Sequence, residues 1–523
     1  MAAVQHNLRT AGNYEAVHPD TDAGLDSIQT AAASIRLAAR EAAPYLYDHL
    51  NDQRLQDLMA KLPIAKAIGK AHKFPWAMRF LAASNATGLT PAAKWCTCIL
   101  RAIEPALVAQ WKGLFRSLPE HVLKAAGIVG DDPMPWFISS TEQLVRMVAA
   151  FSHVGMSQES YEAGRGFAAF DVEQLYVMIV LDDLIASLHT CLHTAWRWFT
   201  DGQPDELPPQ PPAGNNDDPM DVDLNSWLVV YANKGFPAEF IPGGHHLSEA
   251  AVHARFGDHT PERRQGMGMW NHHLGKDKVK GNFCVLPLES ACRLVDLIVR
   301  TSFIRFGDVA YHQTTGIPMG VNPGVFLANC YLYDYEMKWL SQVRDLLQRF
   351  PPNALQTHMG KFPDPVVETI IDIEDQEYLL EHATTGQIGD AVLPAVYVLF
   401  WFQFMARYVD DIITGPNKYV RRLVHVTDTL LGGLLKGFYP PYLNLKETKS
   451  ADADGAPHAP RQCHALNVTI VSKPATTSSG DVVMFASTQH FDTHTHNDDM
   501  YMIFTTHVFN PHIRSTHFKK LLA

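Results

Sequence analysis

The feature that most constrains this chain is a pair of adjacent carboxylates enclosed by strand-forming residues. In Arg407-Tyr408-Val409-Asp410-Asp411-Ile412-Ile413, aromatic and β-branched residues stand on both sides of the pair, which predicts a tight β-hairpin turn. Adjacent ionised aspartates raise each other's pKa, and a bound divalent cation is a common compensation that keeps both charged at neutral pH. An exposed Asp-Asp turn without a ligand is the alternative, and the pair alone does not decide.

A second carboxylate lies far upstream in FAAFDVEQLY, residues 167–176, where Asp171 ends a short apolar strand and a helix is expected to follow. Magnesium takes hard oxygen ligands, and proteins usually hold it with one or two carboxylates plus substrate phosphates. If Asp171 meets Asp410 in the fold, the two would form a polymerase-type metal site. The nearby Asp182 and Asp183 are expected on a solvated helix face.

Two helices are predicted between and after these motifs. A glycine- and proline-rich loop at 314–321 leads into a stretch that Asn322 can cap, and apolar residues at helical spacing predict a helix over 322–349. Leucines and valines at similar spacing predict another over 418–435. Glycines in the loop allow its backbone to approach a base or a phosphate closely.

The charge of the chain at first argues against a nucleic-acid partner, because phosphate polymers attract lysine and arginine. The formal net charge is −12, but residues 201–223 hold seven acidic and no basic residues, and residues 362–390 hold eight acidic and no basic residues. Without these two segments the balance becomes +3, which is compatible with a nucleic-acid enzyme. Six prolines in 201–223 predict an exposed, flexible insertion.

Composition indicates a globular protein of several subdomains, with 523 residues, 46% hydrophobic and 19% charged. The N-terminus lacks a secretory pattern, and the most apolar run, 391–406, falls short of the roughly 20 residues that a membrane span needs. Seven cysteines lack paired metal-ligand spacing, which suits a reducing compartment. We therefore expect an intracellular protein, nuclear or cytoplasmic, with no membrane partner.

In their order along the chain, these segments resemble the palm motifs of reverse transcriptases, over about residues 61–500. FAAFDVEQLY looks like the first motif, TGIPMGVNPGVFLAN like the second, and ARYVDDIITG like the third with its Tyr-x-Asp-Asp signature. YLNLKETKS resembles the fourth, and LNVTI with VVMFASTQH resembles the hairpin that closes the palm. Upstream, IGKAHKFPWAMRFLAAS is similar to the fingers segment of Penelope-like retroelements, the subfamily that the chain most resembles.

The resemblance implies an RNA-directed DNA polymerase, a nucleotidyltransferase that uses two Mg²⁺ ions, or Mn²⁺ ions in their place. Asp171 and Asp410 would ligate both metals, and Asp411 would support them. One ion would activate the 3′-hydroxyl of the primer, and the other would neutralise the triphosphate and the leaving pyrophosphate. The implied partners are an RNA template, a DNA or RNA primer and deoxynucleoside triphosphates.

The resemblance also assigns substrate contacts. Tyr176 would be the bulky gate that clashes with a ribose 2′-hydroxyl and so favours deoxynucleotides. The other assigned residues are Lys73 and Arg79 on the triphosphate, with Lys70 as an alternative; Val172, whose carbonyl would contribute at the metals; Gln313, Gly316 and Gly320, lining the nucleotide pocket and the primer-template groove; and Lys446, with Lys449 as an alternative, as proton donor to pyrophosphate.

The implied fold is α+β, a right-hand polymerase with fingers and palm, in which an antiparallel sheet packs on helices. We expect a helical N-terminal extension, a small or partial thumb, and no endonuclease or ribonuclease H motif. The expected segments are the extension at 1–60, fingers at 61–165, the first part of the palm at 166–200, a partly disordered acidic insertion at 201–285, the second palm motif and its helix at 286–350, an acidic insertion at 351–390, the palm with its catalytic hairpin at 391–490, and a partial thumb at 491–523.

Two other functions stay open. A domesticated relative could bind nucleic acid without catalysis, which the missing full thumb and endonuclease favour. Against it, an idle site would gain by losing its three aspartates, because they repel one another without metal. An RNA-dependent RNA polymerase shares the two-metal chemistry, but Tyr176 and the Tyr-Val-Asp-Asp turn weigh against it. A telomerase is disfavoured, because about 60 residues before the fingers-like segment are too few for its large RNA-binding region.

Overall fold

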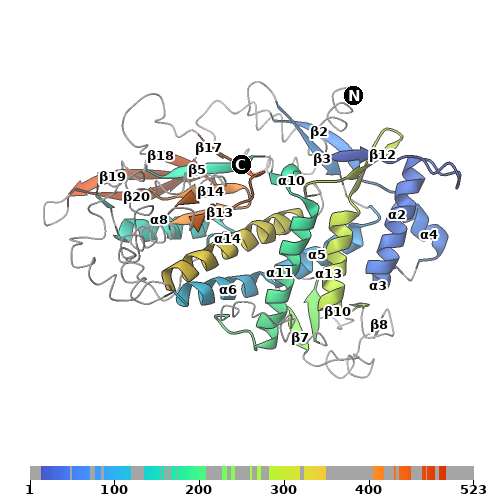
Figure 1. Ribbon diagram of the computed structural model, residues 1–523, viewed down its shortest axis with the longest axis horizontal. Coiled ribbons are helices and arrows are strands. Elements are labelled where there is room, and N and C mark those ends of the chain that lie inside the picture. The colour runs from blue at the N-terminus through green and yellow to red at the C-terminus, as the bar shows by residue number, and fades with distance from the viewer. Residues whose placement is uncertain are drawn as a thin grey trace, which may run out of the picture.

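The described residues form helices and largely antiparallel sheets, an α+β arrangement, as the sequence predicts (Figure 1). The computed structural model describes residues 13–47, 50–70, 77–83, 87–118, 135–154, 156–157, 161, 166–173, 175–207, 226–232, 237–241, 260–261, 268–271, 282–317, 323–348, 404–416, 429–430, 435–448, 462–466, 468–476 and 482–490. Within this part of the chain no helix combines the length and apolar content that a membrane crossing requires.

The sheet that positions the candidate site has four antiparallel strands. They are β13 (Met405–Tyr408), β14 (Asp411–Thr414), β5 (Ala168–Glu173) and β17 (Asn444–Glu447), in that spatial order. The apolar residues of β5 are buried, whereas Asp171 and Glu173 are half-buried. Because β5 is central, it brings an early segment of the chain between two late ones.

Helices pack beside this sheet and form most of the core (Figure 1). The long α14 (Gly324–Gln348) crosses α11 (Leu181–Thr200), and α6 (Glu104–Arg116) contacts both. On the other side of α11 lie α13 (Leu288–Arg300) and α5 (Thr90–Ala102). The position of α14 confirms the predicted helix over 322–349.

A second antiparallel sheet holds β18 (Gln462–Ala465), β19 (Val468–Thr476), β20 (Val482–His490) and β4 (Met156–Ser157), with α8 (Thr141–Val154) packed on β20. The β19–β20 pairing confirms the hairpin predicted from LNVTI and VVMFASTQH. The second predicted helix is wrong where it is described, since β15 (Thr429–Leu430) pairs with β16 (Leu435–Lys436). Two glycines, Gly432 and Gly433, weaken the helical propensity of that stretch.

The N-terminal extension is helical in part. It contains α2 (Ser27–Ala42), α3 (Pro44–Tyr47) and α4 (Asp52–Met59), and a capping box between Asp26 and Gln29 starts the first of these. It also supplies β1 (Tyr14–Ala16) to a five-stranded sheet with β12 (Val309–Gln313), β11 (Phe303–Phe306), β2 (Ile64–Lys70) and β3 (Ala77–Ala83). The extension therefore adds an edge strand, paired with β12, to the sheet whose other edge is the predicted fingers hairpin β2–β3.

The segment predicted as an insertion at 201–285 contributes to the core. It supplies β6 (Trp227–Tyr231), β7 (Glu239–Ile241), β8 (Thr260–Pro261) and β9 (Gly268–Asn271), which form one sheet with β10 (Asn282–Pro287). The β6 strand is buried over its whole length. Leu207 is buried too, and its amide donates to the Ala109 carbonyl of α6 at 2.9 Å. The prediction of a fully exposed stretch from 201 is therefore wrong at Leu207, and 208–223 lie outside the described residues.

Candidate active site

The carboxylate pair sits at the turn between β13 and β14, as predicted, although Asp411 is already the first residue of β14. Val409 and Asp410 make the turn, and Val409 has φ 58°, in the left-handed region. A β-branched residue rarely adopts this conformation, which costs about 1–3 kcal/mol and persists where surrounding contacts enforce it. The turn is thus held in a strained shape by its neighbours.

The sheet brings Asp171 opposite Asp411. The Val172 amide donates to the Asp410 carbonyl at 2.9 Å, so these two residues form a hydrogen-bonded pair of the ladder. The adjacent pair, Asp171 and Asp411, is then of the non-hydrogen-bonded type, in which opposed side chains share one face and lie closest. The early and late acids therefore meet through Asp411, whereas the predicted meeting of Asp171 with Asp410 and the role of these acids as metal ligands stay predictions.

The clustered negative charges of these carboxylates favour a bound cation. Partial burial, followed by the negative charges of Asp410 and Asp171, raises the pKa of Asp411 to about 6. A cation placed among these oxygens would reverse that shift. In the described part of the chain, no three His, Cys, Asp or Glu side chains lie close enough to hold a metal ion by themselves. Magnesium commonly needs only one or two protein carboxylates, because substrate phosphates and waters complete its shell, so this donor set fits it.

Lys446 lies on the other side of the central strand, opposite Asp171. Its ammonium is 3.2 Å from Glu173 Oε1, and Asn444 donates to Glu173 Oε2 at 2.9 Å. The side chain of Lys446 is largely exposed, and such an ion pair holds a lysine only weakly. Lys446 thus lies beside the aspartates and is held loosely enough to contact a substrate. Its partner in this structure is Glu173, a residue to which sequence reasoning assigned no role.

Tyr176 lies in the short helix α10 (Leu175–Met178), directly after β5, and is half-buried. The loop after β12 is fastened to it: the Ile317 amide donates to the Tyr176 carbonyl at 2.8 Å, and the Gly316 amide to the Ile179 carbonyl at 2.7 Å. Gly316 has φ +88°, and a Cβ there would lie 2.3 Å from the Tyr176 carbonyl oxygen. Only glycine allows the two motifs to come this close.

We expect Gly316→Ala to destabilise the protein more than Gly307→Ala. Both positions have positive φ, but a Cβ on Gly307 meets nothing within 4 Å. The difference isolates the close contact with Tyr176 and should be about 1–3 kcal/mol, the usual cost of overpacking. Urea denaturation of the two variants measures it. If both variants lose the same free energy of unfolding, the loop that carries Gly316 can move away from Tyr176 without cost.

Gln313 does not present its side chain to a groove in this structure. It is 2% exposed, accepts from Ser302 Oγ at 3.1 Å and donates to the Thr315 carbonyl at 2.9 Å. Thr315 in turn donates to the Asn13 side chain at 2.8 Å. Gln313 therefore supports the loop from within, and the N-terminal segment contributes a contact that the sequence did not predict.

The remaining assigned residues are placed only in part. Arg79 pairs with Ile68 across the β2–β3 hairpin, and Lys70 ends β2 opposite Ala77, but the placement of their side chains is not described. Lys73, Gly320 and Lys449 lie outside the described residues. Val172 is buried in the central strand. The contacts proposed for the triphosphate therefore stay predictions.

Behind the turn, a buried charged network joins β13 to α14. Arg407 and Glu336 are both fully buried and form a two-pronged ion pair, with Nε to Oε1 at 2.5 Å and Nη2 to Oε2 at 3.2 Å. Burial acts to lower the pKa of Arg407, but the charges of Glu336 and Tyr439 and the hydrogen bond to Glu336 together raise it above its usual value. Sequence reasoning assigned no role to either residue. The sequence does show that Arg407 is a charged residue inside an apolar strand. A charged side chain that is buried needs a partner, so this position could have been singled out.

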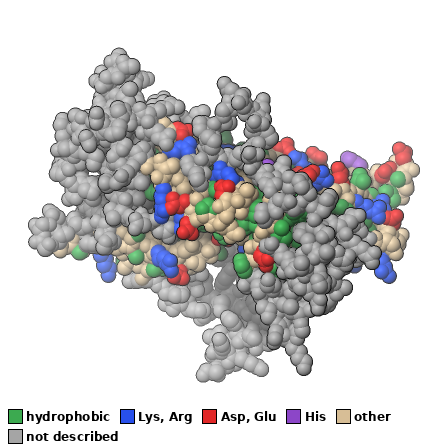
Figure 2. Space-filling model, turned by 90° about the horizontal axis from the view of Figure 1, so that it is seen from below, with side chains coloured by type: hydrophobic (Ala, Val, Ile, Leu, Met, Phe, Trp, Pro, Cys, Tyr) green, Lys and Arg blue, Asp and Glu red, His purple; other side chains and the backbone are tan. Residues whose placement is uncertain are grey.

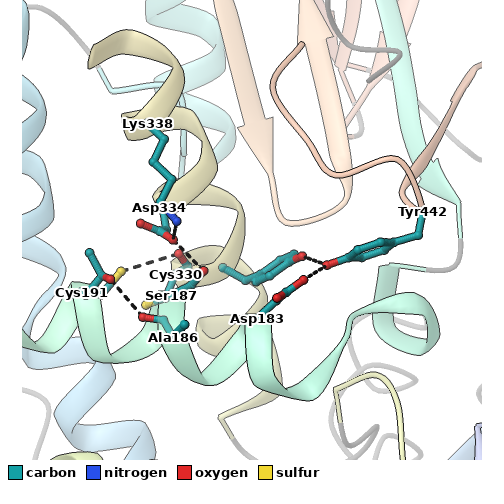
Figure 3. A network of polar contacts seen from close by, with 10 residues as sticks. Asp183, Ala186, Ser187, Cys191, Cys330, Asp334, Lys338 and Tyr442 are labelled. Atoms are coloured by element: carbon teal, nitrogen blue, oxygen red, sulfur yellow. Dashed lines mark hydrogen bonds and ion pairs between the residues drawn. The ribbon is translucent and has the colours of Figure 1, made fainter. Parts of the chain in front are cut away.

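Other polar contacts tie α11 to α14 and to the segment before β17 (Figure 3). Ser187 and Lys338 both donate to Asp334 at 2.7 Å. The Tyr442 hydroxyl donates to Asp183 at 2.8 Å and contacts the Tyr331 hydroxyl. Asp183, expected on a solvated helix face, is therefore an internal anchor for the chain that leads to Lys446. Asp182 matches the expectation better, because it is exposed and pairs with Arg300.

The face drawn in Figure 2 carries acidic and basic side chains next to each other over its described part. Acidic and basic groups are therefore interspersed there. Nucleic-acid surfaces are usually recognised by a concentration of lysine and arginine. This view alone therefore does not locate a nucleic-acid surface.

No protein-family model matches the chain, and no curated protein matches it. Among solved structures, it is similar to apo telomerase from Candida tropicalis, with 11% identity, a TM-score of 0.32 and coverage of 79% of this chain and 47% of that one. It is also similar to telomerase from Candida albicans in complex with a TWJ fragment of telomeric RNA, with 8% identity, a TM-score of 0.34 and coverage of 78% and 45%. The chain thus spans less than half of either telomerase chain, and likenesses this low carry no functional argument.

Proposed function

We propose that the chain is an RNA-directed DNA polymerase of the reverse transcriptase type, as its resemblance to Penelope-like retroelements implies. The single observation that carries the proposal is the register of the four-stranded sheet. It pairs Asp171 with Asp411 next to the Asp410 turn, although these acids are far apart in the sequence. A palm of this kind uses such a juxtaposition to bind the metal ions of nucleotidyl transfer.

In this proposal the residues of the sheet position the reacting groups. Asp171 and Asp410 would hold magnesium, and Asp411 would support them from the start of β14. When bound, magnesium would lower the charge repulsion between the primer's 3′-oxygen and the triphosphate. Lys446, one strand away, would donate a proton to the leaving pyrophosphate after leaving Glu173.

A templated primer-extension assay tests the proposal. The full chain is mixed with a primer annealed to an RNA template, with magnesium, and with either deoxynucleotides or ribonucleotides. We expect extension with deoxynucleotides that stops when a chelator removes the metal. Extension with ribonucleotides only would instead identify an RNA polymerase.

The competing function is a protein of the same fold that binds nucleic acid without catalysis. The lack of a self-sufficient three-ligand metal cluster in the described residues favours it. Binding of the primer-template by folded protein, with incorporation of neither nucleotide at any magnesium or manganese concentration, would establish it in place of the polymerase.

Sugar selection is expected to depend on Tyr176. The Tyr176→Ala variant should raise the efficiency of ribonucleotide incorporation relative to deoxynucleotide incorporation by roughly tenfold or more, because the side chain that clashes with the 2′-hydroxyl is removed. The ratio of the two kcat/KM values measures the effect. A ratio identical to that of the wild type would remove the gate role from Tyr176.

A further inference from the structure

We propose that the buried side chain of Arg407 is a tie that holds the carboxylate turn to α14, and that Arg407 and Glu336 are therefore positioning residues. The tie itself follows from contacts within the protein. Its consequence for catalysis rests on the proposed polymerase function. The two can be tested separately.

The first step concerns how Arg407 reaches the turn. Its Nη1 donates to the carbonyl oxygen of Val409 at 3.3 Å. That carbonyl belongs to the peptide unit that leads into Asp410, and Val409 is the residue with the left-handed φ of 58°. A contact that fixes this peptide unit fixes the direction in which the backbone enters Asp410 and then Asp411.

The second step concerns what holds Arg407. The same Nη1 donates to Asn329 Oδ1 at 2.9 Å, while Nε and Nη2 bind both carboxylate oxygens of Glu336. Asn329 and Glu336 both lie on α14. The planar guanidinium offers donors in a fixed geometry, so its orientation is set by three acceptors at once. The position of the turn is thereby fixed relative to α14 as well as relative to its own sheet.

Glu336 extends the tie to a further element. The Tyr439 hydroxyl donates to Glu336 Oε1 at 2.8 Å, and Tyr439 is fully enclosed. Tyr439 precedes β17, the strand that carries Lys446. The carboxylate of Glu336 thus binds Arg407, which lies in the hairpin that carries Asp410. It also binds Tyr439, which lies in the segment leading to Lys446.

The backbone of Arg407 is fixed independently of its side chain. Its amide donates to the Trp136 carbonyl at 2.6 Å, and its carbonyl accepts from Ile138 at 2.8 Å. Loss of the side-chain contacts should therefore leave β13 in place and loosen only the turn. Partners that orient metal ligands in this indirect way typically change metal affinity or activity by about ten- to a hundredfold when they are mutated.

The test compares Tyr439→Phe with Tyr47→Phe. Each change removes one buried hydroxyl that donates a hydrogen bond, to Glu336 in the first case and to the Gly88 carbonyl in the second, at 3.1 Å. Tyr47 lies in the N-terminal helices, away from the sheet that carries Asp410. Asn329→Ala serves as a second variant, since it removes an acceptor from Nη1 while leaving the ion pair intact.

Two readouts are measured for each variant. In primer extension, Tyr439→Phe and Asn329→Ala should lower kcat about tenfold and raise the magnesium concentration for half-maximal rate, with KM for the deoxynucleotide within about twofold. In amide hydrogen exchange of the protein without substrate, the peptide covering 404–416 should exchange faster. Tyr47→Phe should match the wild type in both readouts.

The outcomes separate the two hypotheses. Unchanged exchange over 404–416 in both Tyr439→Phe and Asn329→Ala, or an equal increase in Tyr47→Phe, overturns the tie. If the exchange changes as expected but the wild type extends no primer, the tie stands and the polymerase function fails. If the wild type is active and the exchange changes while kcat and the magnesium requirement do not, the positioning role is overturned.

Discussion

The Asp410→Asn protein will extend a primer roughly a thousandfold more slowly than the wild type, a loss of about 4 kcal/mol of transition-state stabilisation. The change keeps the size of the side chain and removes its negative charge, so the turn can retain its shape while its affinity for magnesium falls. Primer-template binding should stay within about threefold, because phosphate contacts by basic residues supply most of that affinity. Single-turnover extension and a binding titration measure the two quantities.

Asp308→Asn is the matched control. Asp308 lies in the β11–β12 turn, its side chain is fully exposed, and it pairs only loosely with Arg305 at 3.5 Å. Its activity should equal that of the wild type. Because the acids act as one unit, the Asp171→Asn, Asp410→Asn double variant should lose little more than either single variant. Near-normal extension rates in Asp410→Asn would show that Asp410 takes no part in the reaction. Loss of folding in this variant would show that its role is structural.

The second large effect is on stability. Arg407→Met should lower the free energy of unfolding by about 3–5 kcal/mol, because it leaves the fully buried carboxylate of Glu336 without its ionic partner. Arg300→Met is the control: the Arg300–Asp182 pair is exposed, and its loss should cost less than about 1 kcal/mol. Urea denaturation followed by circular dichroism compares the two variants.

The double variant Arg407→Met, Glu336→Met separates the cost of an unpaired charge from the value of the pair. An apolar pair of similar volume avoids the desolvation of both ions, so much of the lost stability should return. By contrast, activity should not return, since the contact with the Val409 carbonyl is still missing. Recovery of activity together with stability would show that the network has only a structural role.

The amino-acid sequence by itself determined the local elements of the site. Tyr408, Val409, Asp410 and Ile412 predict a hairpin with carboxylates at its turn, and the structure has β13 and β14 there. The helix over 322–349 was predictable because side-chain periodicity and capping residues act over a few positions, whereas the β19–β20 hairpin was expected from the resemblance to palm motifs. The resemblance to palm motifs added the expectation that Asp171 joins them.

Predictions from local sequence patterns were wrong in two segments. The proline-rich, acidic stretch from 201 predicts an exposed insertion, yet Leu207 is buried against α6, and β6 lies in the core. The helical spacing over 418–435 gave way to the β15–β16 pair. At Leu207 and β6, contacts between distant segments outweighed a weak local preference. Over 418–435, Gly432 and Gly433 had already weakened the helical preference.

Only the tertiary structure decided which distant groups meet. The pairing of Asp411 with Asp171 depends on the register of two strands that belong to separate parts of the chain. The choice of Glu336 as partner of Arg407 depends on how α14 packs behind the hairpin. A buried charge reveals in the sequence only that it needs a partner, whereas the identity of that partner is settled by long-range packing.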